Sequence, residues 1–575
     1  MKKNKNIFVA DFETCATEPI SYDANLNILN EDIEAKVWLS CLYNINTEEY
    51  ILNKNIEDFM NTIKNKNYTI YFHNLKFDGS FIIPYLLNNK FKQLTDKENR
   101  EKKFKPKTFH LLIDEINNWY TLTIYWSFKT EKLPRSTRTK KRWIKTEIID
   151  SLKILPMSVE EMGSKFLKLP IEDQKGKIDY ESVRPDGYIA TEEEKEYIIK
   201  DCKIVAMGVK QLLDNGLTKK TISGNAFKSW MDIRFKGNRM FYRTYMPELT
   251  LEEDSFIRAS YKGGWTYCNP KYKNLDRIVN GLTLDVNSLY PYVMKTYPLP
   301  FGKPIYFKGK YKEDSKNPLY VQRVKIAGFK LKKGKLPVIT LRNDCLRNKG
   351  EYLTEGTEIT LTLTNIDLDL IKECYTLSGL KYLDGYKFGQ VTDFFTDYVN
   401  YYGKQKINAV NPVQRQIAKL MLNSLYGKFG SKPLRTPKLI NLDKNGIMKT
   451  TLDVKGEYTA TPYYIPVATF ITAYARSITI RAAIANLDYF MYADTDSLHL
   501  NIQPEQLETI DLNIDFNFSG KLGLWKVENV FTDCKFLGSK RYIEFGYDYE
   551  DFIKNGNKKM EWNVKCAGLP KELDS

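Results

Sequence analysis

Two aspartates stand close together at residues 494 and 496, inside the apolar, aromatic stretch YFMYADTDSLHL. An apolar run, a short polar turn and a second alternating run predict a β-hairpin with both acids at its tip. Like charges this close repel each other unless a cation lies between them. Asp and Ser also form ordinary turns, so this pattern alone leaves a purely structural role open.

A second group of acids lies near the start of the chain. Asp11 and Glu13 are two residues apart in IFVADFET, and on a strand both side chains leave the same face. A later apolar run, YFHNLKFDGSFII, leads into Asn74 and Asp78, and we expect Asp78 and Gly79 to open a turn. Oxygen ligands of this kind select hard cations such as Mg²⁺ or Mn²⁺.

A further acid is predicted on a helix. Thr191 and Glu194 form a capping box, and the Asn-Gly pair at 215–216 predicts the end of that helix. Tyr197 and Asp201 are four residues apart within it, so they share one face. The end of a first domain is expected just beyond this helix, near residue 221.

The composition indicates a folded, multidomain protein with an acidic partner. The chain has 575 residues, a formal net charge of +16 and many aromatic side chains, namely 39 Tyr, 30 Phe and 8 Trp. Basic charge combined with stacking surfaces is typical of proteins that bind nucleic acid. Eight scattered cysteines without a C-x-x-C pair indicate neither a zinc site nor a disulfide framework. No stretch approaches a signal peptide or a membrane span.

The segment 119–151 reads as two strands joined by a basic loop. Such a loop either contacts a phosphate backbone or faces water, and its pattern favours neither. The basic residues assigned to the loop are Lys132, Arg135, Arg138, Lys140, Lys141 and Arg142.

A third acid partner for the hairpin appears in TLDVNSLYPYVM, where apolar residues lead into Asp285 and a turn. Between these acids, NPVQRQIAKLMLNSLYGKFG predicts a helix with Asn411 as its cap and Pro412 in its first position. Its periodicity predicts an amphipathic helix. The polar face carries Arg415, Lys419, Asn423 and Tyr426, and the apolar face carries Ile417, Leu420, Met421 and Leu425.

These segments, in this order, resemble the motifs of family B DNA polymerases that carry a 3′–5′ proofreading exonuclease. The first acids resemble its D-x-E, N-x₃-D and Y-x₃-D motifs. DVNSLYP, KLMLNSLYG and YADTDS resemble polymerase motifs A, B and C, and YKGG and KRY resemble two smaller signatures. The resemblance is closest to the protein-primed, phi29-like branch. It implies a mixed α/β fold with a ribonuclease-H-like exonuclease domain followed by a right-hand polymerase domain.

The resemblance implies roles for residues of the exonuclease domain. Asp11, Glu13, Asp78 and Asp201 would hold two Mg²⁺ ions, Tyr197 would orient the attacking water, and Lys175 would contact the scissile phosphate. The family carries an acid where this chain has Lys177, so that ligand role is lost or moves to Asp179. The residues expected to grip single-stranded DNA are Thr14, Tyr71, His73, Asn74, Phe77, Phe81, Ser151 and Leu152.

The resemblance also implies roles in the polymerase domain. Asp285 and Asp496 would bind two Mg²⁺ ions, replaceable by Mn²⁺, with Asp494 and the Val286 carbonyl as further ligands. The residues expected at the incoming nucleotide are Ser288, Leu289, Tyr290, Lys406, Lys419, Asn423 and Tyr426. Those expected to contact DNA are Tyr261, Gly263, Gly264, Lys540 and Tyr542.

Domain bounds follow from the motif positions. We expect an exonuclease domain at 1–221 and a polymerase domain at 222–575, with the palm at 222–296 and 463–560 and the fingers at 395–430. Insertions are expected at 297–394, for a priming terminal protein, and at 431–462, for processivity and strand displacement. The Asn445–Gly446 pair predicts a hairpin in the second insertion. A short thumb is expected at 561–575, since the chain stops soon after KCAGLP.

The sequence therefore predicts a DNA-directed DNA polymerase that replicates a phage-type linear genome from a protein primer, as a monomer in the host cytoplasm. Its partners would be DNA, deoxynucleoside triphosphates and a terminal protein, without a membrane. Two alternatives stay open. One is a family B polymerase that uses nucleic-acid primers, and the other is a non-catalytic DNA-binding protein.

Overall fold

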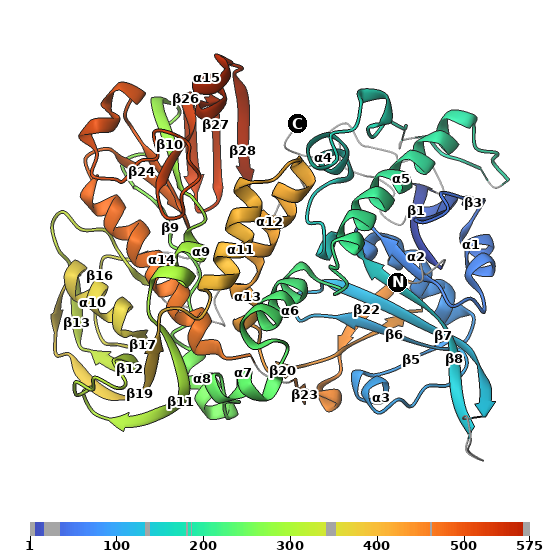
Figure 1. The fold of residues 1–575 in the computed structure, drawn as a ribbon, viewed down its shortest axis with the longest axis horizontal. Helices are drawn as coiled ribbons and strands as arrows, with labels where there is room; N and C mark the ends of the chain where they lie inside the picture. Colours follow the sequence, from blue (N-terminus) through green and yellow to red (C-terminus); the bar gives the residue numbers. More distant parts are fainter. Residues whose placement is uncertain are drawn as a thin grey trace. The chain divides into compact units, whose positions relative to one another are not determined.

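The computed structural model describes residues 6–16, 35–132, 139–179, 182–185, 187–340, 352–444, 446–460 and 463–566. The chain divides into two compact units (Figure 1). The first comprises residues 1–225, 408–421 and 432–461, and the second comprises residues 226–407, 422–431 and 462–575. No helix in the described part of the chain is long and apolar enough to cross a membrane.

The first unit is built on a mixed sheet that has eight strands in its described part. Strand β1 is paired on both sides, antiparallel to β2 and parallel to β4, so it lies inside the sheet. The order is β3 (Tyr50–Asn53), β2 (Ala35–Asn44), β1 (Ile7–Ala16), β4 (Thr69–Phe72), β8 (Thr139–Asp150), β7 (Trp119–Lys132), β6 (Thr108–Ile113) and β5 (Lys92–Gln93).

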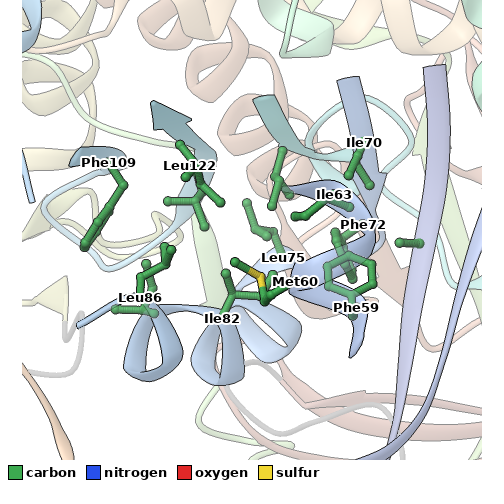
Figure 2. Close-up of a cluster of buried hydrophobic side chains, with 14 of the residues drawn as sticks. Phe59, Met60, Ile63, Ile70, Phe72, Leu75, Ile82, Leu86, Phe109 and Leu122 are labelled. Atoms are coloured by element: carbon green, nitrogen blue, oxygen red, sulfur yellow. The ribbon is translucent and has the colours of Figure 1, made fainter. Parts of the chain in front are cut away.

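Helix α2 (Leu75–Asn88) covers part of this sheet and buries its apolar side chains there. Figure 2 shows Ile82 and Leu86 of α2 in the same cluster as Phe109 and Leu122 of the strands. The turn expected at residues 78–79 is wrong, because both residues lie inside α2. Gly79 serves packing instead, since a Cβ there would lie 2.7 Å from the Trp119 ring.

Helix α5 (Glu192–Asp214) confirms the predicted capping box and the predicted end. The Thr191 side chain accepts a hydrogen bond from the Glu194 amide, and the Glu194 carboxylate accepts one from the Thr191 amide. Gly216, just after the helix, has φ +77°, a conformation that glycine adopts without strain.

The two predicted strands at 119–151 are confirmed as β7 and β8, but the basic cluster is not all in the loop. Lys140, Lys141 and Arg142 lie on β8. The Lys141 ammonium lies 4.3 Å from the centre of the Phe128 ring, and Arg142 forms an ion pair with Glu131. Arg135 and Arg138 lie outside the described residues.

The second insertion forms the predicted hairpin and packs within the first unit. Strands β21 (Lys438–Leu442) and β22 (Met448–Leu452) pair, and β20 (Leu434–Arg435) pairs with β23 (Tyr458–Thr459). The connection between β21 and β22 covers 443–447, with Gly446 at φ +80° and Asn445 outside the described residues. Ile440 of β21 is 2% exposed and belongs to the same apolar cluster as the strands in Figure 2.

The second unit is built on a sheet of seven strands in its described part. The segment expected as a short thumb, 561–575, supplies an edge strand of this sheet with residues 561–566. Residues 567–575 lie outside the described part. The order is β28 (Glu561–Cys566), β27 (Arg541–Asp548), β26 (Trp525–Gly538), β10 (Ile278–Val286), β25 (Ser497–Leu500), β24 (Phe490–Asp494) and β9 (Thr266–Cys268).

The first insertion, at 297–394, has an apolar core of its own. Strands β11 (Leu299–Lys308), β19 (Lys381–Val391), β12 (Leu319–Ile326) and β17 (Ile359–Thr364) form one sheet, followed by helix α10 (Asn365–Cys374). Val321, Leu363 and Phe388 are fully buried in it. Some of its charges pair internally, as Arg323 does with Asp384 through two hydrogen bonds of 2.8 and 2.6 Å.

The predicted amphipathic helix is present as α12 (Pro412–Ser424), which follows α11 (Thr396–Ile407). The Asn411 carboxamide accepts a hydrogen bond from the Gln414 amide at 2.9 Å, which confirms the cap. Ile417 and Met421 are buried and Lys419 is exposed, as the periodicity predicts. The helix ends at Ser424, and a short helix α13 (Tyr426–Phe429) follows it.

Candidate active sites

The first unit brings together the four carboxylates predicted near the start of the chain. Asp11 and Glu13 lie on β1, Asp78 lies in the first turn of α2, and Asp201 lies on α5. Glu13, Asp78 and Asp201 are buried. Central strand pairing fixes the first two, and the capped helix α5 fixes the last.

Burial and mutual repulsion raise the pKa of these carboxyl groups. Burial raises the pKa of Asp11 to about 7, with Asp201 as the next cause. Burial and then Asp11 and Asp201 raise the pKa of Glu13 to about 8. The pKa of Asp78 also lies well above its ordinary value, through burial and then Asp11. Perturbed acids gathered in this way mark a candidate functional site.

Lys175 and Tyr197 join this group. The Lys175 ammonium lies 3.0 Å from Oδ2 of Asp201 and 5.7 Å from the centre of the Tyr197 ring. Tyr197 is buried on α5. Asp179, the suggested substitute ligand, is instead exposed and accepts a hydrogen bond from the Ser182 hydroxyl.

Two oxygens in this cluster fit a cation. Oδ1 of Asp78 and Oδ1 of Asp201 are buried and have no hydrogen-bond partner among the described residues. A buried anionic oxygen without a partner is costly, and a hard cation would satisfy it. In the described part of the chain, however, no three His, Cys, Asp or Glu side chains stand in an arrangement that could hold a metal ion as they are. A cation would therefore have to draw these repelling carboxylates closer together.

This crowding predicts a stability that depends on pH and on metal. A carboxyl group whose pKa is raised by folding stabilises the fold at low pH, and this contribution is lost as pH rises through the folded pKa. The stabilising contribution of Asp11 is lost as pH rises through about 7, and that of Glu13 as pH rises through about 8. In EDTA, Asp78→Asn should therefore melt at a higher temperature than the wild type at pH 8.5, by roughly 2–4 °C per kcal/mol recovered.

The control for this prediction is the same pair of proteins at pH 4.5 and with Mg²⁺. At low pH the wild-type carboxyl groups are protonated and the advantage of Asp78→Asn should vanish. With Mg²⁺ the advantage should shrink or reverse, because the wild type gains a ligand that the variant binds less well. A wild type that melts higher than Asp78→Asn in EDTA at pH 8.5 would contradict the repulsion.

The residues predicted to grip single-stranded DNA divide by exposure. Phe77 is about half exposed, and its ring lies 5.8 Å from that of Phe81. Asn74 is exposed at the N-terminus of α2, and Thr14 and Leu152 are half-buried. Tyr71 and Ser151 are buried. A nucleic-acid strand would therefore contact the exposed side chains of Phe77 and Asn74 first.

His73 and Asp150 have structural contacts that the sequence did not predict. His73 Nδ1 lies 2.9 Å from the Ser151 hydroxyl and Nε2 lies 2.7 Å from the Met157 carbonyl, and burial lowers the His73 pKa to about 4. The buried Asp150 carboxylate accepts a hydrogen bond from the Asn74 amide at 3.1 Å. Asp150 thus holds the end of β8 against the start of α2.

Arg184 is a second residue that sequence reasoning missed. Its guanidinium forms an ion pair with Glu194 at 2.9 Å, lies 4.3 Å from the centre of the Trp38 ring and is buried. Its charge also opposes the rise in the Glu13 pKa. Glu194 is ten residues away, but Trp38 is distant in the chain, so the local sequence does not show that this arginine is buried.

The second unit holds the acids of the opening motif at the tip of the β24–β25 hairpin, as predicted. Asp494 ends β24, Asp496 lies in the turn, and Thr495 between them has φ +64°. Asp285 on β10 pairs in register with Ser497, and the Val286 amide donates to the Asp496 carbonyl at 2.9 Å. Strand pairing thus places all three acids at one end of the sheet.

A lysine lies at this site too. The Lys540 ammonium lies 2.9 Å from Oδ1 of Asp494, which also accepts hydrogen bonds from the hydroxyls of Thr266 and Thr495. Burial raises the pKa of Asp496 to about 6, and the charges of Asp494 and Glu528 add to the rise. Neither Thr266 nor Glu528 was predicted from the sequence.

The two residues of the KRY signature are tied to the same hairpin. The Lys540 amide donates to the Tyr492 hydroxyl at 2.7 Å. Tyr542 on β27 packs against Tyr492, with ring centres 5.2 Å apart. The signature residues therefore lie beside Asp494 at the end of β24.

The predicted nucleotide residues of the second unit lie around the start of helix α9 (Leu289–Thr296). The rings of Tyr290 and Tyr426 pack with centres 4.2 Å apart. Burial raises the pKa of Tyr290, and Tyr426 and the charge of Asp496 add to the rise. The Lys406 ammonium bonds the Asn287 carboxamide and the Ser288 hydroxyl at 3.2 and 3.3 Å.

The remaining nucleotide residues have different surroundings. Ser288 has φ +54°, a strained backbone conformation of the kind found at functional sites, and Leu289 is buried. Lys419 and Asn423 are exposed on helix α12.

The YKGG segment is anchored by helix α14 (Ile465–Ala485). The Arg476 guanidinium donates to the carbonyls of Lys262 and Gly263 at 2.7 and 2.9 Å. Gly264 lies so close to Thr495 that a Cβ would approach its side chain to 2.5 Å. The segment therefore packs directly against the turn that carries the acids, with Tyr261 half-buried at its start.

Comparisons with known proteins agree with this arrangement. The family model of DNA polymerase type B, organellar and viral, matches residues 59–512. The DNA polymerase of Bacillus phage M2 is 37% identical over 552 residues, covering 93% of this chain and 90% of the relative. That of Bacillus phage phi29 is 36% identical over 561 residues, covering 96% and 92%.

The fold agrees as well. A crystal structure of phi29 DNA polymerase superposes with a TM-score of 0.85 at 34% identity, covering 99% of this chain and 93% of that one. Another solved structure, of phi29 DNA polymerase with primer-template DNA and incoming nucleotides, superposes with a TM-score of 0.83. The mixed α/β architecture and the family resemblance drawn from the motifs are thereby confirmed. This chain belongs to the organellar and viral type B DNA polymerases and is a DNA-directed DNA polymerase of the phi29 type.

Proposed function

We propose that this polymerase copies a linear phage genome from a protein primer, displaces the non-template strand, and excises mispaired ends in a separate 3′–5′ exonuclease site. The observation that carries the proposal is the presence of two carboxylate clusters on two units of one chain, each with a lysine beside it. One cluster would add nucleotides and the other would remove them.

Asp285 and Asp496 would hold two Mg²⁺ ions in the second unit, with Asp494 and the Val286 carbonyl as further ligands. In the first unit Asp11, Glu13, Asp78 and Asp201 would do the same. When bound, such ions neutralise the charge that develops on a transferring phosphoryl group. Oxygen-only donor sets of this kind suit Mg²⁺, with Mn²⁺ as a substitute.

The chain's own residues would bind and orient the substrates. Tyr290 and Tyr426 offer a packed aromatic surface beside the acids, suited to the sugar and base of an incoming deoxynucleoside triphosphate. Lys406 would supply positive charge for the triphosphate, and Lys540 and Tyr542 would hold the primer end. The family resemblance implies a further triphosphate contact for Lys419. In the first unit Tyr197 would orient the attacking water and Lys175 would contact the scissile phosphate.

The solved relative bound to primer-template DNA and nucleotides supports DNA and deoxynucleoside triphosphates as the substrates of this chain. The test of the proposal is a replication assay on a linear template, with and without a candidate terminal protein. Nucleotide attachment to that protein, dependent on Mg²⁺ and on the template, would support protein priming. Extension of DNA primers without any attachment would favour a polymerase started from nucleic-acid primers.

Tyr290→Val should relax the choice of sugar. The Tyr290 ring packs against Tyr426 at the start of α9, where a rigid ring would exclude the ribose 2′-hydroxyl. We expect ribonucleotide use relative to deoxynucleotide use to rise by about 10- to 100-fold, the size of effect typical of a single steric contact. A competition assay measures this ratio, with Tyr290→Phe as the matched control. An unchanged ratio in Tyr290→Val would show that the Tyr290 ring does not exclude the ribose 2′-hydroxyl.

The first insertion should serve protein-primed initiation more than extension. Within the described part of this insertion, Lys308 and Lys312 are exposed and available to a partner protein. Lys308→Glu/Lys312→Glu should weaken initiation on a terminal protein by about 10-fold at low salt, and less at high salt. Extension of a DNA primer should stay near wild type.

The matched control reverses the same number of charges elsewhere. Lys64 and Lys66 are exposed on the first unit, and Lys64→Glu/Lys66→Glu should change neither reaction. If the insertion variant lost initiation and extension equally, the insertion would contact DNA or support the fold rather than a terminal protein.

A further inference from the structure

We propose that Thr283, His499 and Glu544 form a buried network that fixes the primer-end residues Lys540 and Tyr542 relative to the polymerase carboxylates. His499 and Glu544 are positioning residues, which act through their neighbours and not on the substrate. The inference rests on the proposed function, because it assigns these residues to the balance between extension and excision.

The network consists of three mutual contacts. His499 Nδ1 lies 2.6 Å from Oε1 of Glu544, and the Thr283 hydroxyl donates to the same oxygen at 3.1 Å. The Thr283 hydroxyl also lies 3.2 Å from His499 Nδ1. The side chains of His499 and Glu544 are fully buried. Such a short, water-excluded contact has a well-defined geometry.

The three residues come from three strands that carry the functional groups. Thr283 on β10 precedes Asp285 by two residues, and His499 on β25 follows Asp496 by three. Glu544 lies on β27, and β26 and β10 stand between β27 and β25 in the sheet. The Glu544 side chain therefore links strands that share no backbone hydrogen bonds.

Glu544 is fully supplied with donors. Besides Thr283 and His499, the carboxamides of Asn529 and Asn563 donate to Oε2 at 3.3 and 3.4 Å. A buried carboxylate needs several donors, and this one has four. Because Glu544 Oε1 accepts, we assign the Nδ1–H tautomer to His499. Its Nε2 has no hydrogen-bond partner in the described part of the chain.

The His499 ring connects this network to the primer-end residues by packing contacts. It packs edge-on against Tyr542 and Tyr492, with ring centres 4.9 and 5.1 Å away. The Tyr492 hydroxyl in turn accepts the hydrogen bond from the Lys540 amide. Tyr542 thus contacts His499 directly, and Lys540 is held by Tyr492, which contacts His499.

A purely structural role would not need these polar groups. Well-packed apolar side chains of similar size often stabilise a core as well as a buried ion pair does, whereas polar networks can select one arrangement of the parts. Loosening the network should leave the sheet folded but let the primer end leave the polymerase site more often. The end would then reach the exonuclease site at higher nucleotide concentrations than in the wild type.

The test compares Glu544→Leu with Glu544→Gln in the full chain. Glutamine keeps an acceptor for His499 and Thr283, whereas leucine removes it at similar size. The readout is the deoxynucleotide concentration at which extension of a primer-template balances excision. We expect Glu544→Leu to raise it about 10-fold, as the loss of about 1.4 kcal/mol would, and Glu544→Gln to restore most of the difference.

Two further readouts separate the possible failures. Excision of a single-stranded oligonucleotide should stay at the wild-type rate in both variants, and the apparent KM for primer-template should rise in Glu544→Leu alone. An unchanged balance and KM in a folded Glu544→Leu would overturn the inference. A wild type without excision would refute the proposed proofreading, and the KM would then still decide the inference.

A second pair of variants covers a folding failure of Glu544→Leu. His499→Phe keeps the aromatic packing but removes the donor to Glu544, whereas His499→Asn keeps a donor near the position of Nδ1. His499→Phe should show the shifted balance and His499→Asn should show less of it. Equal behaviour of these two variants would overturn the inference.

Discussion

Asp496→Ala is expected to lower nucleotide addition by about a thousandfold or more, because Asp496 is proposed as a metal ligand and losing such a ligand costs several kcal/mol of transition-state stabilisation. Asp496 lies in the hairpin turn where burial and the charges of Asp494 and Glu528 raise its pKa to about 6. Its side chain therefore stands in an environment that favours a cation as partner. Single-turnover addition of one nucleotide to a paired primer measures the effect.

The matched control for this variant is Asp511→Ala, an exposed aspartate of the same unit. It should add nucleotides at nearly the wild-type rate. Excision of a single-stranded end by Asp496→Ala should also persist, because the first unit supplies its own carboxylates. If Asp496→Ala extended primers like the wild type, the assignment of the polymerase site would be wrong.

Removing the hairpin insertion is expected to abolish long products on primed circular single-stranded DNA. The variant deletes residues 431–462 and joins Gly430 to Tyr463 through a short Gly/Ser linker. Addition of a single nucleotide should continue, because none of the polymerase carboxylates lies in the deleted segment. The loss should be largest at raised salt, where electrostatic DNA binding weakens.

The structure changes how this deletion should be designed. Two basic residues of the deleted segment, Lys432 and Lys438, contact Glu115 of the first unit. Ile440 is buried in the apolar core of the first unit, and the Gln93 carboxamide bonds the backbone of Lys438 and Ile440 at 3.2 and 2.8 Å. Complete deletion therefore also exposes apolar surface of the first unit.

A milder variant keeps the hairpin but weakens its contacts with Gln93, Asp96 and Arg100. The Tyr458 hydroxyl donates to Asp96 at 2.9 Å, and the Arg100 guanidinium lies 3.4 Å from the centre of the Tyr458 ring. Gln93→Ala/Tyr458→Phe removes three hydrogen bonds, each worth about 1 kcal/mol, and should shorten the products of one binding event. Thr450→Ala, at an exposed site on the same hairpin, is the control. Wild-type product lengths after full deletion would refute a role of the insertion in processivity.

The acids and their order along the chain could be predicted from the sequence, because their motifs combine local spacing with strand and helix periodicity. The hairpin that carries Asp494 and Asp496, the capped helix of Asp201 and the Asn411 cap all depend on neighbouring residues. Local patterns of this kind survive folding when tertiary contacts agree with them.

The contacts between distant segments could not be predicted in this way. Ile440 reaches a core formed by residues between 8 and 148, at least 292 positions earlier (440 minus 148), and Glu544 reaches His499 across two other strands. Gly79 looks like a turn residue, but the Trp119 ring decides its role. Such partners follow from the three-dimensional arrangement of the sheet, which no single-sequence periodicity encodes.

One end-labelled primer-template with a mispaired 3′ end tests the central claim, that one chain carries two separate carboxylate sites. With Mg²⁺ and all four deoxynucleotides, the wild type should shorten the primer before extending it. Asp11→Ala/Glu13→Ala should extend the mispaired end slowly without shortening it, and Asp496→Ala should shorten it without extension. If either variant lost both activities while remaining folded, or if both variants kept both, the two-site account would be contradicted.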